Sequence, residues 1–384
     1  MKNKFNFKIL GSGPTGLFLS IALSKFDCNI FLTDLLTKDR LIDKEKTYAI
    51  THSTRKILSK FRLWEKLEPY LFAFDSLSIS DSVTSSMTNL SIFDLDDDIS
   101  SAKAIGWVVK HSDLMTVFFQ EIDNYENIFF MTPQRLLRKK IIFDYQFLST
   151  GANSLDKKLF DFVDIKKSYN QSCLTFKVSL RGNCEKRAYE IFRKEGPLAL
   201  LPLEKNLYQV IWTSSTLKAI ERLNSDKNFL MDNLSTILPD EFKLDQIIGE
   251  FNIFPVSLSL NFQAFNFKKL VFVGDAFHTF HPVGGQGLNI CWRDVNTIFD
   301  LFNKNIVITN MHLSLFKFKY FSSRILDIIF TMFITDSLIS IFANKKLFLF
   351  PIRKVSFLLL NNFLFIRKLV LNQMTKSFIY SRIK

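Results

Sequence analysis

One glycine-rich turn constrains the fold of this chain more than any other feature. The segment Gly11-Ser-Gly13-Pro-Thr-Gly16 matches the pattern GxGxxG. It lies between a predicted strand over residues 5–10 and a predicted helix over residues 17–25. In this context the glycines permit a tight turn, the close approach of a pyrophosphate, and close packing of the helix on the strand. The unit therefore predicts a parallel sheet that opens with a dinucleotide-binding turn.

An acidic residue strengthens this prediction. Asp34 directly follows a second predicted strand over residues 29–33, 18 residues after Gly16. A carboxylate at this place accepts hydrogen bonds from ribose hydroxyls, and the N-terminus of the intervening helix offers free N–H groups to phosphates. The alternative is a glycine turn without a ligand. The combination of strand, helix and acid favours the dinucleotide.

A second turn lies far along the chain. A predicted apolar strand over residues 269–273 runs into Gly274 and Asp275, and a turn rich in Pro and Gly precedes a predicted helix that starts near Gly287. Asp275, at the carboxyl end of a strand, is placed to bind a sugar or ribityl hydroxyl. The glycines let a flat ring lie against the backbone, and the helix N-terminus favours an anionic reduced flavin.

Two histidines in this turn, His278 and His281, are spaced as HxxH. This pair supplies two metal ligands, and no third candidate lies nearby, so we expect no metal site. For His281 two interpretations remain open, an acid–base group and a loop histidine that makes a structural hydrogen bond.

The rest of the chain predicts an α/β fold combined with an antiparallel β-sheet. A helical region is expected over 47–70, exposed strands over 76–99, strand and helix over 103–130, and a strand and turn over 141–154. Antiparallel strands are expected at 173–180, 188–192, 198–203 and 208–213, then a helix at 226–237, and helices after 287. We assign residues 1–75, 100–168 and 256–335 to a discontinuous Rossmann-like domain, 76–99 and 169–255 to a smaller β-sheet domain, and 336–384 to a helical tail.

The tail carries much of the net charge of +13. Residues 337–384 contain nine Lys or Arg and no Asp or Glu. Apolar residues at helical spacing accompany them, namely Val355, Leu358, Leu359, Ile366, Leu369 and Val370, with Asn362 on the same face. An anionic membrane surface suits such a helix, and a pair of helices packed on the protein with solvated lysines is the alternative. Nucleic acid is not expected, because the basic residues are interleaved with apolar ones.

Other features bear on location. No stretch reaches ~18 uncharged apolar residues, so no spanning helix is expected. Residues 1–8 lack the apolar centre of a signal peptide. The four cysteines form no CxxC pair, which indicates free thiols in a reducing compartment.

The two turns together resemble class A flavoprotein monooxygenases. The stretch from Gly274 to Asn289 is similar to that family's Gly-Asp motif. The chain resembles most nearly the ubiquinone-biosynthesis hydroxylases of the 2-polyprenyl-6-methoxyphenol hydroxylase type. Further similar stretches are 48–51 with the helix that follows, 188–202 and 335–344, so the resemblance extends from about 5 to 376.

This resemblance implies an FAD-binding domain interleaved with a substrate domain. It implies that NAD(P)H reduces FAD and that a flavin hydroperoxide formed with O2 hydroxylates the ring of a polyprenylphenol. The implied cofactor-binding residues are Gly11, Gly13, Pro14, Gly16, Asp34, Lys46, Gly274, Asp275, Pro282, Gly285, Gly287, Leu288 and Asn289. His281 and Pro282, on the loop that would face the flavin, are the catalytic candidates.

The chain departs from the family pattern in several places. Thr150 stands where the family has an acid linked to FAD and NAD(P)H binding, and Lys157 stands where an Arg is expected. Lys46 also replaces an Arg, and a lysine cannot make a bidentate clamp. The stretch 131–141 is shortened. These changes keep two alternatives open, a flavin reductase or dehydrogenase of the same fold, and a non-catalytic accessory subunit of the ubiquinone-synthesis assembly.

The resemblance also implies partners and a location. The expected partners are a polyprenylphenol, O2, an anionic membrane surface and other ubiquinone-synthesis proteins. The expected location is the cytoplasm, at the periphery of the inner membrane.

Overall fold

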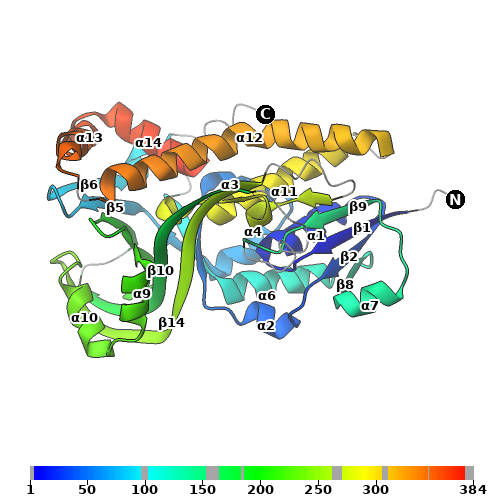
Figure 1. Cartoon of the computed structure of the whole chain (residues 1–384), viewed down its shortest axis with the longest axis horizontal. Helices are drawn as coiled ribbons and strands as arrows, with labels where there is room; N and C mark the ends of the chain where they lie inside the picture. Colours follow the sequence, from blue (N-terminus) through cyan, green and yellow to red (C-terminus); the bar gives the residue numbers. More distant parts are fainter. Residues whose placement is uncertain are drawn as a thin grey trace.

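The computed structural model describes residues 4–96, 103–152, 164–182, 186–261, 270–304, 310–344 and 346–376. Figure 1 shows a parallel α/β region at one end, an antiparallel sheet at the other, and a layer of C-terminal helices along one edge. Two very long strands, β10 (Asp164–Gly182) and β14 (Phe242–Asn261), run between the two regions.

The N-terminal strands form a five-stranded parallel sheet in the order β15-β9-β1-β2-β8. Its members are β1 (Phe5–Leu10), β2 (Cys28–Thr33), β8 (Ile128–Met131), β9 (Tyr145–Leu148) and β15 (Leu270–Phe272). Helix α1 (Pro14–Leu23) is buried from Gly16 to Leu23 because α6 (His111–Ile122) and α11 (Gly287–Asn303) pack against it. The sequence prediction of a parallel β-α-β opening is confirmed.

A small sheet lies beside the parallel one. It contains β3 (Thr47–Ile50), β7 (Gly106–Lys110) and β4 (Phe72–Phe74), all antiparallel. The helix expected over 47–70 is wrong for its first four residues, because pairing with β7 overrides local preference. Helices α3 (His52–Lys60) and α4 (Trp64–Leu67) follow, and a 3-10 turn, η1 (Glu68–Tyr70), ends the segment.

The third sheet has eight strands in the order β16-β14-β10-β13-β12-β11-β5-β6. Besides β10 and β14 it contains β5 (Ser76–Asp81), β6 (Ser86–Ser91), β11 (Arg187–Phe192), β12 (Leu198–Glu204), β13 (Leu207–Ser215) and β16 (His278–Thr279). The predicted antiparallel strands are present, although β5 joins β11 in parallel. The strand β14 was not anticipated. Pairing of β14 with β16 connects this sheet to the second glycine turn.

The helices complete the fold. Those not yet named are α2 (Lys38–Ile42), α7 (Pro133–Arg138), α9 (Thr216–Leu223), α10 (Lys227–Ser235), α12 (Asn310–Phe342), α13 (Phe350–Asn362) and α14 (Leu364–Lys376). Four further 3-10 turns are η2 (Ile92–Asp94), η4 (Gly274–Ala276), η5 (Val283–Gly285) and η6 (Leu347–Leu349). The helical region predicted after 287 is confirmed. One main core joins the parallel sheet to the helices around it, and a second fills the antiparallel sheet beneath α10.

One helix meets the length and composition of a membrane span, which the sequence reasoning did not anticipate. It covers Leu313–Phe342, within α12. The helices after η6, broken at Phe363 by a bend of 101°, pass the same test only as a pair. The span in α12 contains Asp327, whose carboxylate bonds the buried Arg293 and Arg324. The pair between Asp327 and Arg293 of α11 (Gly287–Asn303) attaches α12 to the body of the protein, whereas Arg324 lies on α12 itself.

Candidate active site

The first glycine turn is built by backbone packing. Gly11 has φ +98°, and a Cβ on it would lie 2.7 Å from the backbone of Ser149 and Thr150. A Cβ on Gly16 would lie 1.9 Å from the carbonyl oxygen of Gly11. The Ser149 hydroxyl donates to the carbonyls of Leu10 and Gly11, at 3.0 and 2.9 Å. Strand β9 therefore fixes the turn from behind.

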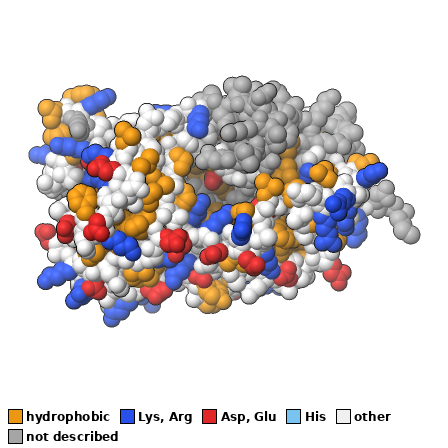
Figure 2. All heavy atoms as spheres, turned by 60° about the horizontal axis from the view of Figure 1, so that its bottom comes forward, with side chains coloured by type: hydrophobic (Ala, Val, Ile, Leu, Met, Phe, Trp, Pro, Cys, Tyr) orange, Lys and Arg blue, Asp and Glu red, His pale blue; other side chains and the backbone are white. Residues whose placement is uncertain are grey.

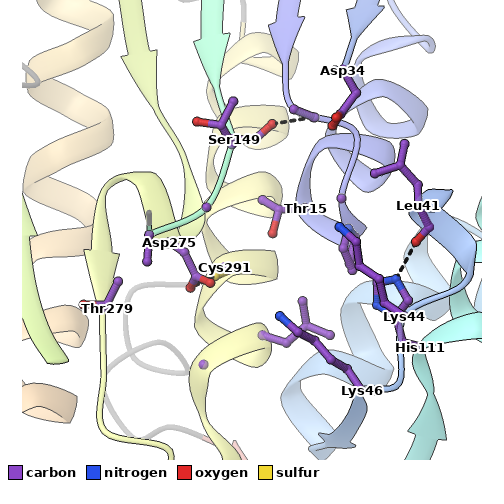
Figure 3. Close-up of a pocket in the computed structure, with 18 of the residues that line it drawn as sticks. Thr15, Asp34, Leu41, Lys44, Lys46, His111, Ser149, Asp275, Thr279 and Cys291 are labelled. Atoms are coloured by element: carbon purple, nitrogen blue, oxygen red, sulfur yellow. Dashed lines mark hydrogen bonds between the residues drawn. The ribbon is translucent and has the colours of Figure 1, made fainter. Parts of the chain in front are cut away.

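Asp34 is oriented by this turn. Its Oδ2 accepts from the Ser12 N–H at 2.7 Å and its Oδ1 from the Leu36 N–H at 3.0 Å. Figure 3 shows Asp34 at the edge of the pocket beside the turn. Each carboxylate oxygen accepts more than one hydrogen bond, so both remain able to accept from a hydroxyl group.

Buried charges hold the second turn instead. Gly274 has φ +64°, and its N–H donates to Oδ2 of Asp294 at 3.0 Å. His278 bonds the same oxygen at 2.7 Å, and Arg324 donates to Oδ1 at 2.7 Å. Burial raises the pKa of Asp294, but His278 and Arg324 outweigh it and hold that pKa below its ordinary value. His278 therefore supports the turn from inside the protein and does not line the cavity.

Asp275 follows Gly274 and lines the cavity. The Cys291 thiol donates to its Oδ1 at 3.4 Å. Lys46 lines the cavity too, from the other side in Figure 3. Burial lowers the pKa of Lys46, and the negative charge of Asp275 opposes that shift. The ammonium of Lys46 also lies 4.7 Å from the centre of the Phe254 ring.

His281 is enclosed at the start of the second loop. The Val283 N–H donates to its Nδ1 at 3.2 Å, so Nε2 carries the proton and faces Oε1 of Gln171 at 3.4 Å. The ring meets Tyr169 edge-on at 5.3 Å. Burial lowers the pKa of His281 to about 3, so the ring is neutral at pH 7. With both nitrogens engaged, the geometry favours the structural hydrogen bond over an acid–base role.

Both turns line a single cavity with a volume of about 1120 Å³. The predicted site residues on its wall are Gly11, Gly13, Pro14, Asp34, Lys46, Asp275, His281, Pro282, Gly285, Gly287 and Leu288. The two turns, more than 250 residues apart in sequence, thus face one space. This is the convergence that the two sequence motifs require.

Three predicted residues lie behind the wall. Gly16 and Gly274 shape the backbone of the turns. The Asn289 amide donates to the carbonyls of Ala49 and Gly285, at 2.9 and 3.0 Å. Asn289 therefore ties the second loop to β3, and any effect on a ligand acts through that loop.

Among the polar residues of the cavity wall that the sequence reasoning missed, Tyr48 and His111 are hydrogen-bonded to each other. The Tyr48 hydroxyl donates to Nδ1 of His111 at 2.9 Å, and His111 Nε2 donates to the Leu41 carbonyl at 2.7 Å. Burial raises the pKa of Tyr48 and lowers that of His111 to about 4. No motif announces this chain of hydrogen bonds, because pairing of β3 with β7 is what brings the two segments together.

The far end of the cavity is largely apolar. The antiparallel sheet contributes Cys173, Leu201, Ile211, Phe254 and Val256 to it. Polar side chains of the same sheet, namely Thr175, Gln209, Ser257 and Thr279, also line the cavity. A planar apolar group fits such a wall. The Gln209 amide is engaged within the protein, because it donates to the Phe176 carbonyl at 3.0 Å and accepts from the Thr47 hydroxyl at 3.1 Å.

Another departure from the family pattern, Thr150, lies beside the first turn. Thr150 lines the cavity beside Gly151, which has φ +86°. Lys157 lies outside the described residues. Among the residues described, no group of three or more His, Cys, Asp or Glu is placed to hold a metal ion.

The space above the glycines that face the cavity shows whether a flavin nucleotide could lie against their backbone. A Cβ added at Gly13, Gly151 or Gly287 would meet nothing within 4 Å. Bare backbone is therefore open to the cavity at both turns. The N-terminus of α1 lies at the first turn, where a pyrophosphate is stabilised. The residues present fit FAD.

Comparison with known proteins gives the same result. A family model described as an FAD binding domain matches residues 165–305. An uncharacterized protein of Synechocystis sp. is 27% identical over 310 residues, covering 76% of this chain and 73% of that protein. The ubiquinone biosynthesis monooxygenase COQ6 of Dictyostelium discoideum is 21% identical, covering 94% of this chain and 86% of that protein. The 3-demethoxyubiquinol 3-hydroxylase of Escherichia coli is 24% identical over 51% of this chain and 54% of its own.

Solved structures share the fold. The p-nitrophenol 4-monooxygenase PnpA of Pseudomonas putida superposes with a TM-score of 0.73 at 13% identity, covering 98% of this chain and 99% of its own. HpxO of Klebsiella pneumoniae, solved with FAD and uric acid, gives a TM-score of 0.70 at 14% identity, covering 98% and 97%. The predicted fold class and FAD as cofactor are confirmed.

Proposed function

We propose that this chain, which belongs to the class A FAD-dependent aromatic monooxygenases, hydroxylates the ring of a polyprenylphenol in ubiquinone synthesis. One observation carries the proposal. The two glycine turns line a cavity that continues without a break to the apolar wall of the antiparallel sheet. Ubiquinone hydroxylases among the relatives support the choice of substrate.

We assign the cofactor-binding roles from this geometry. Gly11, Gly13, Pro14 and Gly16 would form the pyrophosphate turn, and Asp34 would accept from the ribose. Lys46 and Asp275 would bind polar groups of the cofactor between the two turns. Pro282, Gly285, Gly287 and Leu288 would face the flat ring, with Gly274 and Asn289 shaping that loop from behind. The corresponding domain division is the one drawn from the sequence, with residues 76–99 and 169–255 as the substrate domain.

When bound, FAD supplies the electrons, delivered by NAD(P)H in this family, and the activation of O2. The chain contributes position and environment. The apolar wall around Ile211 and Phe254 would orient the substrate ring and exclude water. A neutral His281 keeps a proton on Nε2 and does not compete for protons near pH 7.

Oxygen incorporation tests the reaction. The purified protein is expected to be yellow, to bleach with NAD(P)H without air, and to insert one atom of ¹⁸O₂ into a short-chain polyprenylphenol. Reduction of the prenyl chain without oxygen incorporation would instead identify a flavin reductase. A protein that retains no FAD would indicate an accessory subunit of the ubiquinone-synthesis assembly.

A variant and its matched control test where the substrate binds. Ile211→Asp places a charge in the apolar wall, and we expect at least a roughly hundredfold loss of kcat/KM with FAD still bound. Leu217→Asp is the matched control, because Leu217 is 82% exposed and lies outside the cavity. Equal activity in both variants would place the substrate elsewhere.

The location follows from the substrate. A polyprenylphenol resides in a bilayer, so we place the protein in the cytoplasm, at the periphery of the inner membrane. The net charge of +13 is consistent with an anionic lipid surface.

A further inference from the structure

Exposed apolar side chains gather on the C-terminal helical layer. Of the 25 large apolar side chains that are exposed among the described residues, 15 lie between 315 and 369. They are Leu315, Phe318, Leu326, Ile329, Phe333, Ile334, Leu347, Phe348, Ile352, Val355, Leu358, Phe363, Leu364, Phe365 and Leu369. We call this set the outer surface. Large contiguous apolar patches are rare on proteins that remain free in water.

Helix α12 contributes one regular stripe to the outer surface. Leu315, Phe318, Leu326, Ile329 and Phe333 recur at helical spacing on the side that faces away from the protein. The opposite side is packed, and its buried residues include Phe316, Tyr320, Arg324, Ile328 and Thr335. Figure 1 shows α12 along the edge of the molecule, with the parallel sheet and the helices around it on one side. One face of α12 is therefore exposed and apolar, and the other is packed against the protein.

The corner formed by the bend between α13 and α14 contributes the second part of the outer surface. The bend of 101° at Phe363 leaves Phe363, Leu364 and Phe365 exposed in succession. The single amphipathic helix predicted across 355–370 is wrong, because the bend divides it. Figure 1 shows α13 and α14 on the same edge of the molecule as α12.

Ion pairs fix this corner to the antiparallel sheet. Arg353 is fully buried, donates to the carbonyls of Ile341 and Asn344, and lies 3.7 Å from Asp81 of β5. Arg367 pairs with Asp94 at 2.7 Å. The helix pair thus packs on the protein, as one of the two sequence interpretations expected. The exposed apolar residues are held outward by these contacts and cannot fold back onto the core.

The charge around the outer surface indicates which kind of partner binds there. Residues 337–384 contain no acidic side chain, and Lys346 and Lys354 are exposed beside the apolar residues. By contrast, acidic and basic side chains are interspersed over the face turned forward in Figure 2. Apolar residues flanked by lysines match the acyl chains and headgroups of an anionic bilayer.

We propose that the outer surface inserts into one leaflet of an anionic bilayer, with α12 lying in the plane of the membrane. A crossing helix is excluded by packing, because the inner side of α12 belongs to the main core and Asp327 pairs there with Arg293 and Arg324. The surface thereby extends the proposed membrane location to named residues. It does not depend on the reaction that the enzyme performs.

Vesicle flotation of the full-length protein tests this surface, without substrate or turnover. The vesicles are phosphatidylcholine alone or with about one third phosphatidylglycerol. The first variant, Phe318→Ser with Phe333→Ser and Phe365→Ser, changes residues that are 63%, 66% and 74% exposed. We expect at least a roughly tenfold weaker partition onto the anionic vesicles. The matched control, Leu217→Ser with Ile220→Ser and Phe229→Ser, changes apolar residues that are 82%, 44% and 54% exposed on α9 and α10, and should bind as the unmodified chain does.

A second variant tests the charge. Lys346→Gln with Lys354→Gln should weaken binding to anionic vesicles by roughly fivefold for each lysine and leave binding to neutral vesicles unchanged. Equal binding by the Phe variant and its control would overturn the proposal, as would equal affinity of the unmodified chain for both vesicle types. Light scattering tests whether a second copy of the chain, rather than a bilayer, covers the outer surface. A dimer that the Phe variant abolishes, without vesicle binding by either protein, would assign the surface to self-association. Failure of hydroxylation leaves all these measurements intact, so the two proposals fail separately.

Discussion

The two turns that meet at the cavity are supported in different ways. The first is held by close packing on backbone, with Gly16 against Gly11 and both against Ser149, which directly follows β9. The second is held by a buried network of charges around Asp294, which also bonds the Gly274 N–H. The first turn therefore depends on the absence of side chains, whereas the second depends on particular side chains on α11 and α12. Each turn should fail under a different kind of substitution.

The largest effect is expected at the second turn. Asp294→Ala removes one member of a buried charge network and leaves Arg324 without its Nε partner. Breaking a buried pair in this way costs about 3–5 kcal/mol in the free energy of unfolding. Urea denaturation measures the loss.

Asp300→Ala on the same helix is the control. Asp300 pairs with Lys60 at the surface, where a salt bridge contributes about 0–1 kcal/mol. If both variants lost the same stability, the network would not be what supports the second turn.

The next effect lies at the first turn. Gly16→Ala would place a Cβ 1.9 Å from a backbone oxygen that has little room to move, and should cost about 3 kcal/mol. Gly13→Ala would meet nothing within 4 Å, and its stability should change by about 0.5 kcal/mol or less. Thermal unfolding of the FAD-free proteins compares the two.

The same pair separates folding from cofactor binding. Gly13→Ala should fold normally and bind FAD at least roughly tenfold more weakly, because the new methyl group occupies space that faces the pyrophosphate. Normal FAD affinity in the folded Gly13→Ala variant would show that the pyrophosphate does not bind at this turn.

An effect of intermediate size is expected on the pH dependence of the stability. Burial lowers the pKa of His281 to about 3 from an ordinary value of 6.5. Between these values the unfolded chain binds a proton that the folded protein does not, so stability falls as the pH drops from about 6.5 toward 3. His281→Gln should flatten this part of the stability profile measured by urea denaturation at a series of pH values. The slope that remains is expected to include His111, whose pKa is lowered to about 4. An unchanged profile in His281→Gln would mean that His281 is hydrated in solution.

The smallest effect on stability is expected at Gly287. A Cβ there meets nothing within 4 Å, and Gly287 begins α11, so Gly287→Ala should change stability by about 0.5 kcal/mol or less. FAD affinity should nevertheless fall, because the methyl group would face the flat ring. Equilibrium titration with FAD measures this. Affinity equal to that of the unmodified chain would place the ring away from the second loop.

Much of the fold could be predicted from local patterns. The strand–turn–helix unit at Gly11–Gly16, the antiparallel strands between 173 and 213 and the helices after 287 all follow from short-range periodicity and turn chemistry. Residues 47–50 did not, because a four-residue strand has no signal of its own and forms by pairing with β7. The long strand β14 was missed because bulges and a proline interrupt its alternation.

The sequence by itself determined which residues can form the two turns, since glycine adopts the positive φ at Gly11 and Gly274 without strain and the absence of a Cβ permits the close contact at Gly16. It also determined that the segment after residue 337 has basic residues and no acidic residue of its own. The tertiary structure alone decided that the turns share a cavity, that Tyr48 and His111 meet on its wall, and that Asn289 lies behind it. The physical reason is that glycine geometry is a property of each residue, whereas the cavity that Gly13 and Asp275 share, and the contact between Asp294 and Arg324, exist only after distant segments have packed together.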